Sequence, residues 1–135
     1  MSLKLNDKTL FQSKALIGAR MCESSSGSRV EVFDPATSQV LGTVPEMNSR
    51  DTQAAISEAE SALPAWRSLT AAARSDLLRT WFQLVTDASE DLATLITAEC
   101  GKPMAESRGE VTYAASFLKW YAEEATRAYG DIIPP

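Results

Sequence analysis

The sequence has no histidine, and only two of its 135 residues are cysteines. Without histidine it cannot form serine–histidine or cysteine–histidine nucleophile pairs, histidine zinc sites or an imidazole general base. Cys22 and Cys100 lie far apart and form no C-x-x-C pair, so we expect no disulfide framework and a reducing cytoplasm as the location. These absences exclude a free-standing enzyme of the histidine-dependent classes.

Long apolar runs and an excess of positive charge are also missing. No segment approaches the roughly 18 apolar residues of a membrane span, and the first seven residues lack the apolar core of a secretory signal. Lysine and arginine number 13 against 18 acidic residues, a net charge of −5. We therefore expect neither a membrane nor a nucleic acid as a partner. A hydrophobic content of 44% predicts one globular domain.

Phosphate-binding motifs are absent as well. The pair Gly101-Lys102 resembles part of a phosphate loop, but Ile96 and Pro103 stand where that motif needs Gly and Ser or Thr. No Gly-x-Gly-x-x-Gly fingerprint of a dinucleotide site occurs. Cys100 falls at the C-terminal end of a predicted helix, where the helix dipole disfavours a thiolate, so we interpret it as a structural thiol.

The N-terminal third carries strand and turn signals. A short helix is predicted within residues 6–12, with Asn6 or Asp7 as its cap, and a strand over residues 15–18. Alternation at Val30 and Val32 predicts a second strand after a polar loop. The turn signal Asp34-Pro35-Ala36-Thr37 leads to a return strand over residues 40–44. Residues 14–45 are therefore predicted to form strands and a β-hairpin.

From Ser49 onward the apolar period changes to that of amphipathic helices. Ser49, Thr70 and Ser89 are predicted to cap three helices, and Pro64 to kink or loosen the last turn of the first. Gly101 should end the third helix. The apolar stripe of the second helix is predicted to contain Leu77, Leu78, Trp81, Leu84 and Val85.

A fourth helix should begin at Pro103 and reach about Tyr129, so that four helices fill residues 49–130. This helix carries more aromatic surface than a chain of this size can cover, which predicts burial against further protein. The aromatic residues are Tyr113, Phe117, Trp120, Tyr121 and Tyr129. One interpretation is a piece of a larger enzyme; the other is a stand-alone helical interaction module that binds a partner through this helix.

Five segments together carry a resemblance to a known family. Their order and spacing resemble the start of the aldehyde dehydrogenase superfamily, and the last segment resembles its succinate-semialdehyde dehydrogenase branch. Two departures are Ser38, where the family often has Gly, and Cys100, where Gln, Ser or Thr is more usual. The segments are Ala15-Leu16-Ile17-Gly18, residues 32–37 (VFDPAT), residues 62–67 (ALPAWR), residues 99–103 (ECGKP) and residues 113–131.

The resemblance implies an α+β fragment of an α/β, Rossmann-like enzyme. Residues 1–135 would form the N-terminal part of its cofactor-binding domain, with strands at 14–45 and a helical layer at 49–130. The intact enzyme would oxidise a small aldehyde, succinate semialdehyde, with NAD or NADP, and would be a homo-oligomer. Its nucleophilic cysteine, glutamate and asparagine have no match here, so we expect the chain alone to be non-catalytic and without a cofactor. A different aldehyde dehydrogenase branch is the alternative.

The resemblance also implies three site residues. Tyr113 and then Phe117 would line the tunnel by which the aldehyde enters, although an aromatic core stripe is the favoured role for Phe117. Glu99 would lie near a monovalent cation. The choice between NAD and NADP depends on residues that family members carry after the second core strand, so these 135 residues leave it open.

Overall fold

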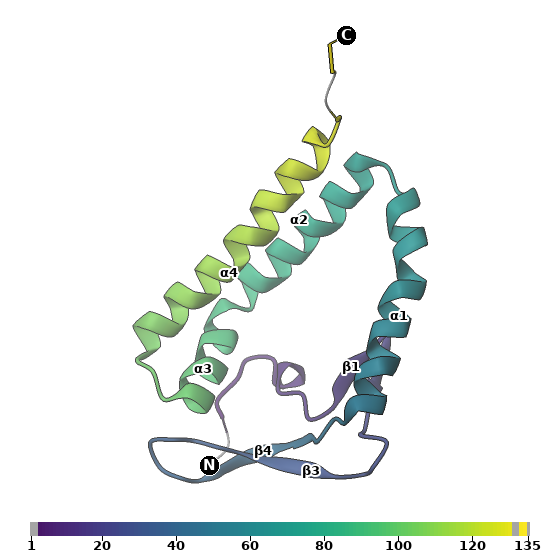
Figure 1. Cartoon of the computed structure of the whole chain (residues 1–135). Helices are drawn as coiled ribbons and strands as arrows, with labels where there is room; N and C mark the ends of the chain where they lie inside the picture. The colour runs from purple at the N-terminus through teal and green to yellow at the C-terminus, as the bar shows by residue number, and fades with distance from the viewer. Residues whose placement is uncertain (1–2, 131–132, 135) are drawn as a thin grey trace.

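The chain folds into two small β-hairpins and four helices (Figure 1). The computed structural model describes residues 3–130 and 133–134, so Met1, Ser2, Asp131, Ile132 and Pro135, including the end of the stretch that carries the resemblance, lie outside the described residues. In chain order the elements are a 3-10 helix η1 (Lys8–Leu10), strands β1 (Ala15–Ile17), β2 (Arg20–Cys22), β3 (Arg29–Phe33) and β4 (Val40–Pro45), helices α1 (Ser49–Ser68), α2 (Ala71–Asp87), α3 (Ser89–Cys100) and α4 (Met104–Glu124), and a 3-10 helix η2 (Ala125–Arg127).

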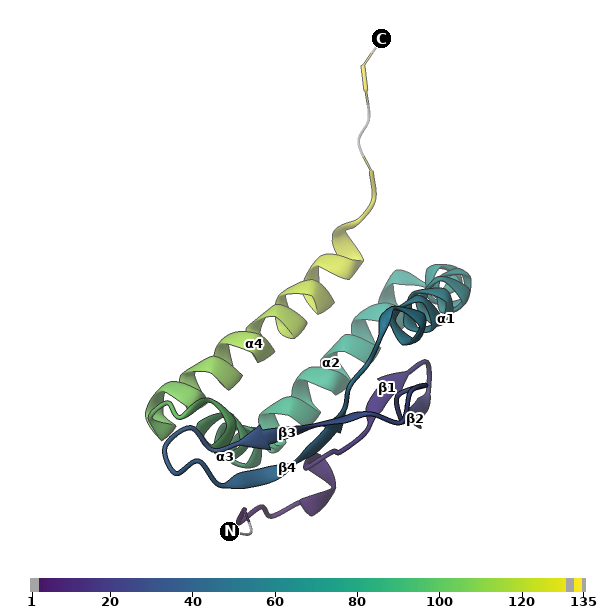
Figure 2. The same cartoon turned by 60° about the horizontal axis from the view of Figure 1, so that its bottom comes forward.

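The strands form two separate antiparallel pairs, β1 with β2 and β3 with β4. The β3–β4 hairpin is the predicted one, whereas β2 was not predicted. The three residues of β2 are too few to show alternation, and the chain reverses into them at Gly18, which has φ 59°. Figure 2 shows the β3–β4 hairpin lying across the end of the helical layer at α3.

The turn between β3 and β4 has the form that its sequence predicts. The Asp34 carboxylate accepts the backbone N–H of Ala36 at 2.8 Å and the Thr37 hydroxyl at 2.9 Å. These two bonds also lower the pKa of Asp34 below its ordinary value. Ser38 adopts a φ of 59°, the left-handed conformation that a glycine would take without strain. The departure from Gly at this position therefore leaves the turn with a strained serine.

The helices begin and end close to the predicted residues, with corrections at their first turns. Thr70 caps α2 as expected, through a bond from the Ala73 N–H at 3.2 Å. The predictions for Ser49 and Ser89 are wrong, because Asn48 caps α1 and Ala88 precedes α3 without a side-chain bond. An amide oxygen at position 48 reaches two backbone N–H groups and so takes the place of the serine next to it.

Pro103 and the last helix depart from expectation. Helix α1 contains Pro64 and continues to Ser68, and the kink expected at Pro64 stays a prediction. Pro103 precedes α4 as its N-cap and is not its first residue. Helix α4 ends at Glu124, where the chain tightens into η2, and not near Tyr129.

Helix α2 lies beside α4, and α3 packs on the first half of α4, while α1 stands apart and contacts β1 (Figure 1). Among the residues that the structure describes, the buried apolar side chains are small, namely Pro45, Ala93, Val111, Ala115 and Ala122. Of the stripe expected on α2, Leu78 and Val85 are half-buried, but Leu77, Trp81 and Leu84 are exposed. No helix among residues 3–130 is long and apolar enough to cross a membrane.

Gly101 joins the hairpin to the helical layer. It ends α3 with φ 73°, which confirms the predicted stop signal. A Cβ atom at this position would lie 2.8 Å from Cγ of Pro35 in the β3–β4 turn. The residue must therefore lack a side chain for two reasons, its backbone conformation and the closeness of the proline ring.

We predict that Gly101→Ala lowers the free energy of unfolding by about 1–3 kcal/mol, because it adds left-handed strain and a clash with Pro35. The matched control is Gly109→Ala within α4, where a Cβ meets nothing within 4 Å. There alanine should stabilise by about 0.5–1 kcal/mol. Urea unfolding followed by circular dichroism measures both, and equal effects of the two substitutions would contradict the assignment.

Candidate functional site

Helix α4 has a buried face and an aromatic face. Val111, Ala115 and Ala122 point toward α2 and α3. At about 100° per residue, the aromatic residues fall on the opposite side of the helix. We call this the aromatic face: Tyr113, Phe117, Trp120 and Tyr121, which are 66%, 46%, 62% and 59% exposed. A helix that is apolar on both sides is typical of one enclosed by protein on both sides.

The structure brings Tyr113 and Phe117, the two predicted tunnel residues, together. Their ring centroids are 4.9 Å apart with the planes at 80°, the edge-to-face arrangement that aromatic pairs prefer. An open hollow of about 370 Å³ lies over them, lined also by Ser116, Trp120 and Tyr121. Sequence reasoning included Trp120 and Tyr121 only as aromatic surface. Their spacing of seven and eight residues from Tyr113, two helical turns, was the signal that could have placed them here.

The chemistry of this hollow is that of an apolar wall. Its side-chain polar groups are the Tyr113 and Tyr121 hydroxyls, the Trp120 indole N–H and Ser116, whose Oγ already donates to the Tyr113 carbonyl oxygen at 2.6 Å. No charged side chain lines it. The hollow therefore suits the carbon chain of a small molecule, and a carboxylate would need a basic group from another part of the protein.

Glu99 lies elsewhere, exposed near the C-terminal end of α3. It borders a second hollow of about 430 Å³ between α2, α3 and α4, together with Glu110 and apolar residues. Glu110 is already paired, since Lys102 donates to it at 2.8 Å, and this bond raises the pKa of Lys102. Within the described ranges, no group of three or more acidic or cysteine side chains could hold a metal. The cation near Glu99 stays a prediction.

The cysteines do not gather with any of these groups. Cys22 is half-buried in β2, where its thiol donates to the Arg20 carbonyl oxygen at 3.5 Å, and Cys100 is exposed at the end of α3. Both are free thiols. Cys100 therefore sits at the helix end that carries partial negative charge, as predicted.

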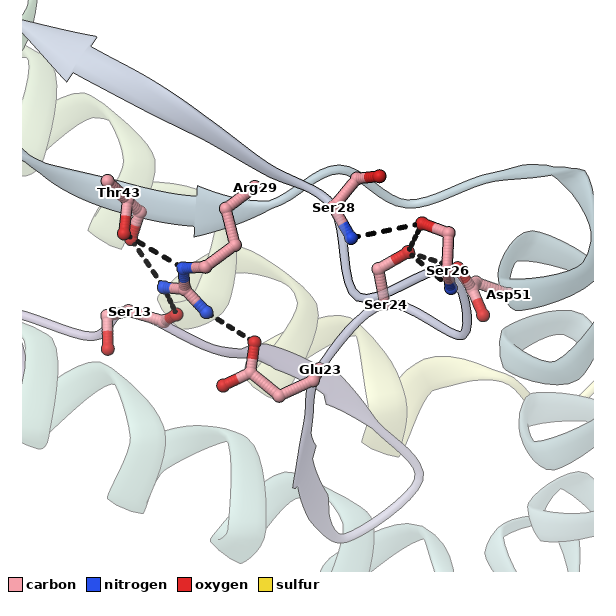
Figure 3. Close-up of polar contacts among 8 residues, drawn as sticks. All are labelled: Ser13, Glu23, Ser24, Ser26, Ser28, Arg29, Thr43 and Asp51. Carbon is pink, nitrogen blue, oxygen red and sulfur yellow. Dashed lines mark hydrogen bonds and ion pairs between the residues drawn. The ribbon is translucent and has the colours of Figure 1, made fainter.

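A polar cluster at the start of α1 was missed at the sequence level (Figure 3). Asp51, only 6% exposed, accepts the Ser24 hydroxyl at 3.1 Å and the backbone N–H groups of Ser25 and Asn48, each at 3.1 Å. Sequence reasoning credited Asp51 only with a favourable charge in the first turn. The spacing Asn48-x-x-Asp51 was the available signal, because it forms a reciprocal capping box.

The hydrogen bonds of Asp51 set its electrostatics. Chiefly the Asn48 N–H, and then the groups of Ser25 and Ser24, lower its pKa below the ordinary aspartate value, against the opposing effect of burial. Both carboxylate oxygens of Asp51 accept hydrogen bonds, Oδ1 from the loop and Oδ2 from the loop and the helix cap. The cluster is therefore an anchor for the serine-rich loop and not a reactive site.

Two further polar contacts hold the N-terminal segment. Asp91, 5% exposed in the first turn of α3, accepts the backbone N–H groups of Asn6 and Asp7 at 2.9 and 2.8 Å. Arg29 of β3 donates to the Ser13 carbonyl oxygen at 2.7 Å and pairs with Glu23 (Figure 3). The guanidinium thus ties the β3–β4 hairpin to the segments on either side of the first hairpin.

Comparison with known proteins identifies the fold. A model of the aldehyde dehydrogenase family matches residues 21–135. The chain is 50% identical over 132 residues to an NADP(+) succinate-semialdehyde dehydrogenase of Escherichia coli, covering 98% of this chain and 27% of that protein. It is also 50% identical to a glutarate-semialdehyde dehydrogenase of Pseudomonas putida, covering 98% of this chain and 28% of that protein.

A solved structure agrees with these matches. The succinate-semialdehyde dehydrogenase from Burkholderia pseudomallei superposes with a TM-score of 0.93 at 46% identity, covering 97% of this chain and 27% of that one. The two hairpins and four helices are thus the first part of an α/β oxidoreductase fold, as expected. The chain belongs to the aldehyde dehydrogenase family. It spans about a quarter of the length of the relatives it matches.

We predict that Asp51→Asn destabilises the chain, because an amide places an N–H donor against the donors of Ser24 and Ser25. Since the folded pKa of Asp51 is lowered, its carboxylate stabilises the fold above the unfolded pKa of about 3.9, and this contribution disappears as pH falls through the folded value.

The difference in unfolding free energy between the parent chain and Asp51→Asn should therefore be constant from about pH 5 to 7 and shrink below about pH 4. Urea unfolding across this range measures it. Asp76→Asn, which neutralises an exposed carboxylate on α2, is the control and should change stability little at any of these pH values. If the difference in unfolding free energy between the parent chain and Asp51→Asn grows toward acid pH, the role of the Asp51 carboxylate as an anchor is contradicted.

Proposed function

We propose that this chain acts as the N-terminal part of an NAD(P)-dependent semialdehyde dehydrogenase that oxidises succinate semialdehyde to succinate. Half of the aligned residues are identical to those of the Escherichia coli succinate-semialdehyde enzyme, across nearly the whole chain. The aromatic face carries the proposal at the structural level, because it offers an apolar wall of the right chemistry for a short carbon chain.

Glutarate semialdehyde is the second candidate substrate. The observation that favours it is the equal identity to the Pseudomonas putida glutarate-semialdehyde enzyme. The two substrates differ by one methylene, which a hydrophobic pocket discriminates by about 10- to 200-fold. Residues of the intact enzyme that hold the distal carboxylate would decide between them, since the hollow over the aromatic face carries no cation.

The chain by itself is proposed to be non-catalytic. It contains no histidine or glycine-rich dinucleotide fingerprint, and neither of its two cysteines lies near the aromatic face. Binding of NAD or NADP is therefore assigned to the rest of the intact enzyme, and residues 1–135 to the N-terminal part of its cofactor-binding domain. A cytoplasmic location, a homo-oligomeric enzyme and the cation near Glu99 stay predictions. The stand-alone interaction module remains the alternative for the isolated chain.

The experiment is a covalent chimera in which residues 1–135 replace the matched quarter of the Escherichia coli relative. NAD(P)H formation from succinate and glutarate semialdehyde gives kcat and KM for each substrate and each cofactor. Turnover with succinate semialdehyde, at a ratio of the two kcat/KM values close to that of the parent Escherichia coli enzyme, is the expected result. A shift of this ratio toward glutarate semialdehyde would support the second candidate, because only residues 1–135 differ from the parent, and no turnover by a folded chimera would overturn the proposal.

In this chimera, Tyr113→Ala should raise KM for the semialdehyde about two- to tenfold with little change in kcat, because the burial of a substrate methylene against the ring, about 0.8 kcal/mol, is lost equally in ground and transition states. Thr112→Ala, on the same helix but outside this hollow, is the control. If Phe117→Ala lowers Tm and leaves KM unchanged, that residue belongs to a core stripe and not to the tunnel.

A further inference from the structure

Helix α4 is joined to its two neighbouring helices by an ion pair toward each of its ends. Toward its start, the Arg108 guanidinium donates to both carboxylate oxygens of Glu90 on α3, at 2.8 and 2.9 Å. At its end, Glu123 accepts a bond at 3.1 Å from Arg79 of α2. The Nε of Arg79 also donates to the buried Ser75 hydroxyl at 3.3 Å, which fixes the direction of the guanidinium. We call these two pairs the helix clamps, and each joins α4 to a different helix (Figure 1).

The packing of α4 between the clamps relies on small side chains. Interlocking of side-chain ridges with grooves fixes the relative position of two packed helices, and small side chains form shallow ridges. Beside Val111 and Ala115, an open hollow of about 330 Å³ lies between α4 and Phe82 of α2. Packing alone therefore resists a slide or rotation of α4 less than large interlocking side chains would. The side chains that α4 buries are Ser107, Val111, Ala115 and Ala122.

The clamps are placed where they can resist both of these motions. Arg108 and Glu123 are fifteen residues apart, roughly 22 Å along the helix axis. Around the axis, Arg108 lies about 140° from Tyr113, and Glu123 lies about 120° from Phe117. Because the two contacts lie far apart on the side away from these rings, a movement of α4 that displaces the rings also stretches the clamps.

We propose that the two helix clamps position the aromatic face of α4 against the semialdehyde, so that their four charged residues set substrate affinity without touching the substrate. The inference rests on the proposed function, since it takes the aromatic face as a wall of the substrate path. The side chains of Arg108 and Glu90 are 52% and 59% exposed, so dissolved salt should weaken the clamp. The bidentate geometry of this clamp adds directional constraint to its charge attraction.

The test uses the covalent chimera with the Escherichia coli relative. Arg108→Gln and Glu123→Gln should each raise KM for the semialdehyde about two- to fivefold with little change in kcat, because a displaced wall loses contact equally in ground and transition states. The ratio of KM between variant and parent should shrink toward one as salt rises to about 1 M, where the screening length is about 3 Å.

A charge-swapped variant separates positioning from general damage. Glu123→Arg alone places two cations together and should raise KM more than Glu123→Gln does. Adding Arg79→Glu restores an ion pair of reversed direction, and KM should return to within about twofold of the parent. The swap is made at this clamp because an arginine near the C-terminal end of α4 suits the helix dipole.

Glu124→Gln is the matched control. It removes the same charge from the next residue, whose partner Arg127 lies three positions along the same stretch of chain and not on another helix. This variant should leave KM within about twofold of the parent. Thermal unfolding followed by circular dichroism checks that every variant of the chimera is folded.

Two outcomes in an active chimera would overturn the proposal and leave the proposed function standing: equal KM values for Glu123→Gln and Glu124→Gln, or no recovery in the charge-swapped variant. A folded chimera without turnover would reject the proposed function instead. Hydrogen–deuterium exchange of residues 104–124 then tests the clamps without a substrate. Faster exchange in Glu123→Gln than in Glu124→Gln, reversed by the charge swap, would support the clamps, and equal exchange would reject them.

Discussion

Two buried aspartates hold the N-terminal third of this chain to its helices. Asp51 and Asp91 each occupy the third position of a helix, and each accepts hydrogen bonds from a segment far away in sequence. Asp51 binds the Ser24 hydroxyl and the Ser25 backbone N–H of a loop, and Asp91 binds the backbone N–H groups of Asn6 and Asp7. At that position the helix dipole also favours a carboxylate. The two hairpins are short, with mostly exposed or half-buried side chains, and contribute little apolar packing of their own. Their placement therefore depends on these charge-assisted hydrogen bonds, on Arg29 and on the contact of Pro35 with Gly101.

Local signals predicted the elements better than they predicted what the elements face. The turn at Asp34, the cap at Thr70 and the stop at Gly101 are decided by residues within a few positions, so the sequence determines them directly. The caps of α1 and α3 were misplaced, because several neighbouring side chains could have bonded to the first N–H groups of these helices. Strand β2 was missed, because it depends on pairing with β1. Asp51 was understood only as a first-turn charge because its burial depends on a loop 26 residues away.

The predicted stripe on α2 shows the same limit. A 3.6-residue period identifies the apolar positions of a helix but not which body covers them, and here α4 covers only one side. Tyr113 and Phe117 were placed on the correct helix, and their spacing explains why they meet. Their assignment to a tunnel came from resemblance alone, because an apolar wall has no chemical signature that distinguishes substrate from neighbouring protein.

The anchoring of Asn6 and Asp7 by Asp91 has a consequence for synthesis on the ribosome. The partners are 85 and 84 residues apart, so the N-terminal segment leaves the ribosome long before its acceptor exists. At about 5–20 residues per second the delay is roughly 4–17 s. During that interval Asn6 and Asp7 have no carboxylate to hold them, and the unpaired edges of the neighbouring β1–β2 hairpin are open to other chains until α1 has formed. Residues 6 and 7 are thus secured only after Asp91 has been made, and nascent-chain chaperones would have long access to this segment.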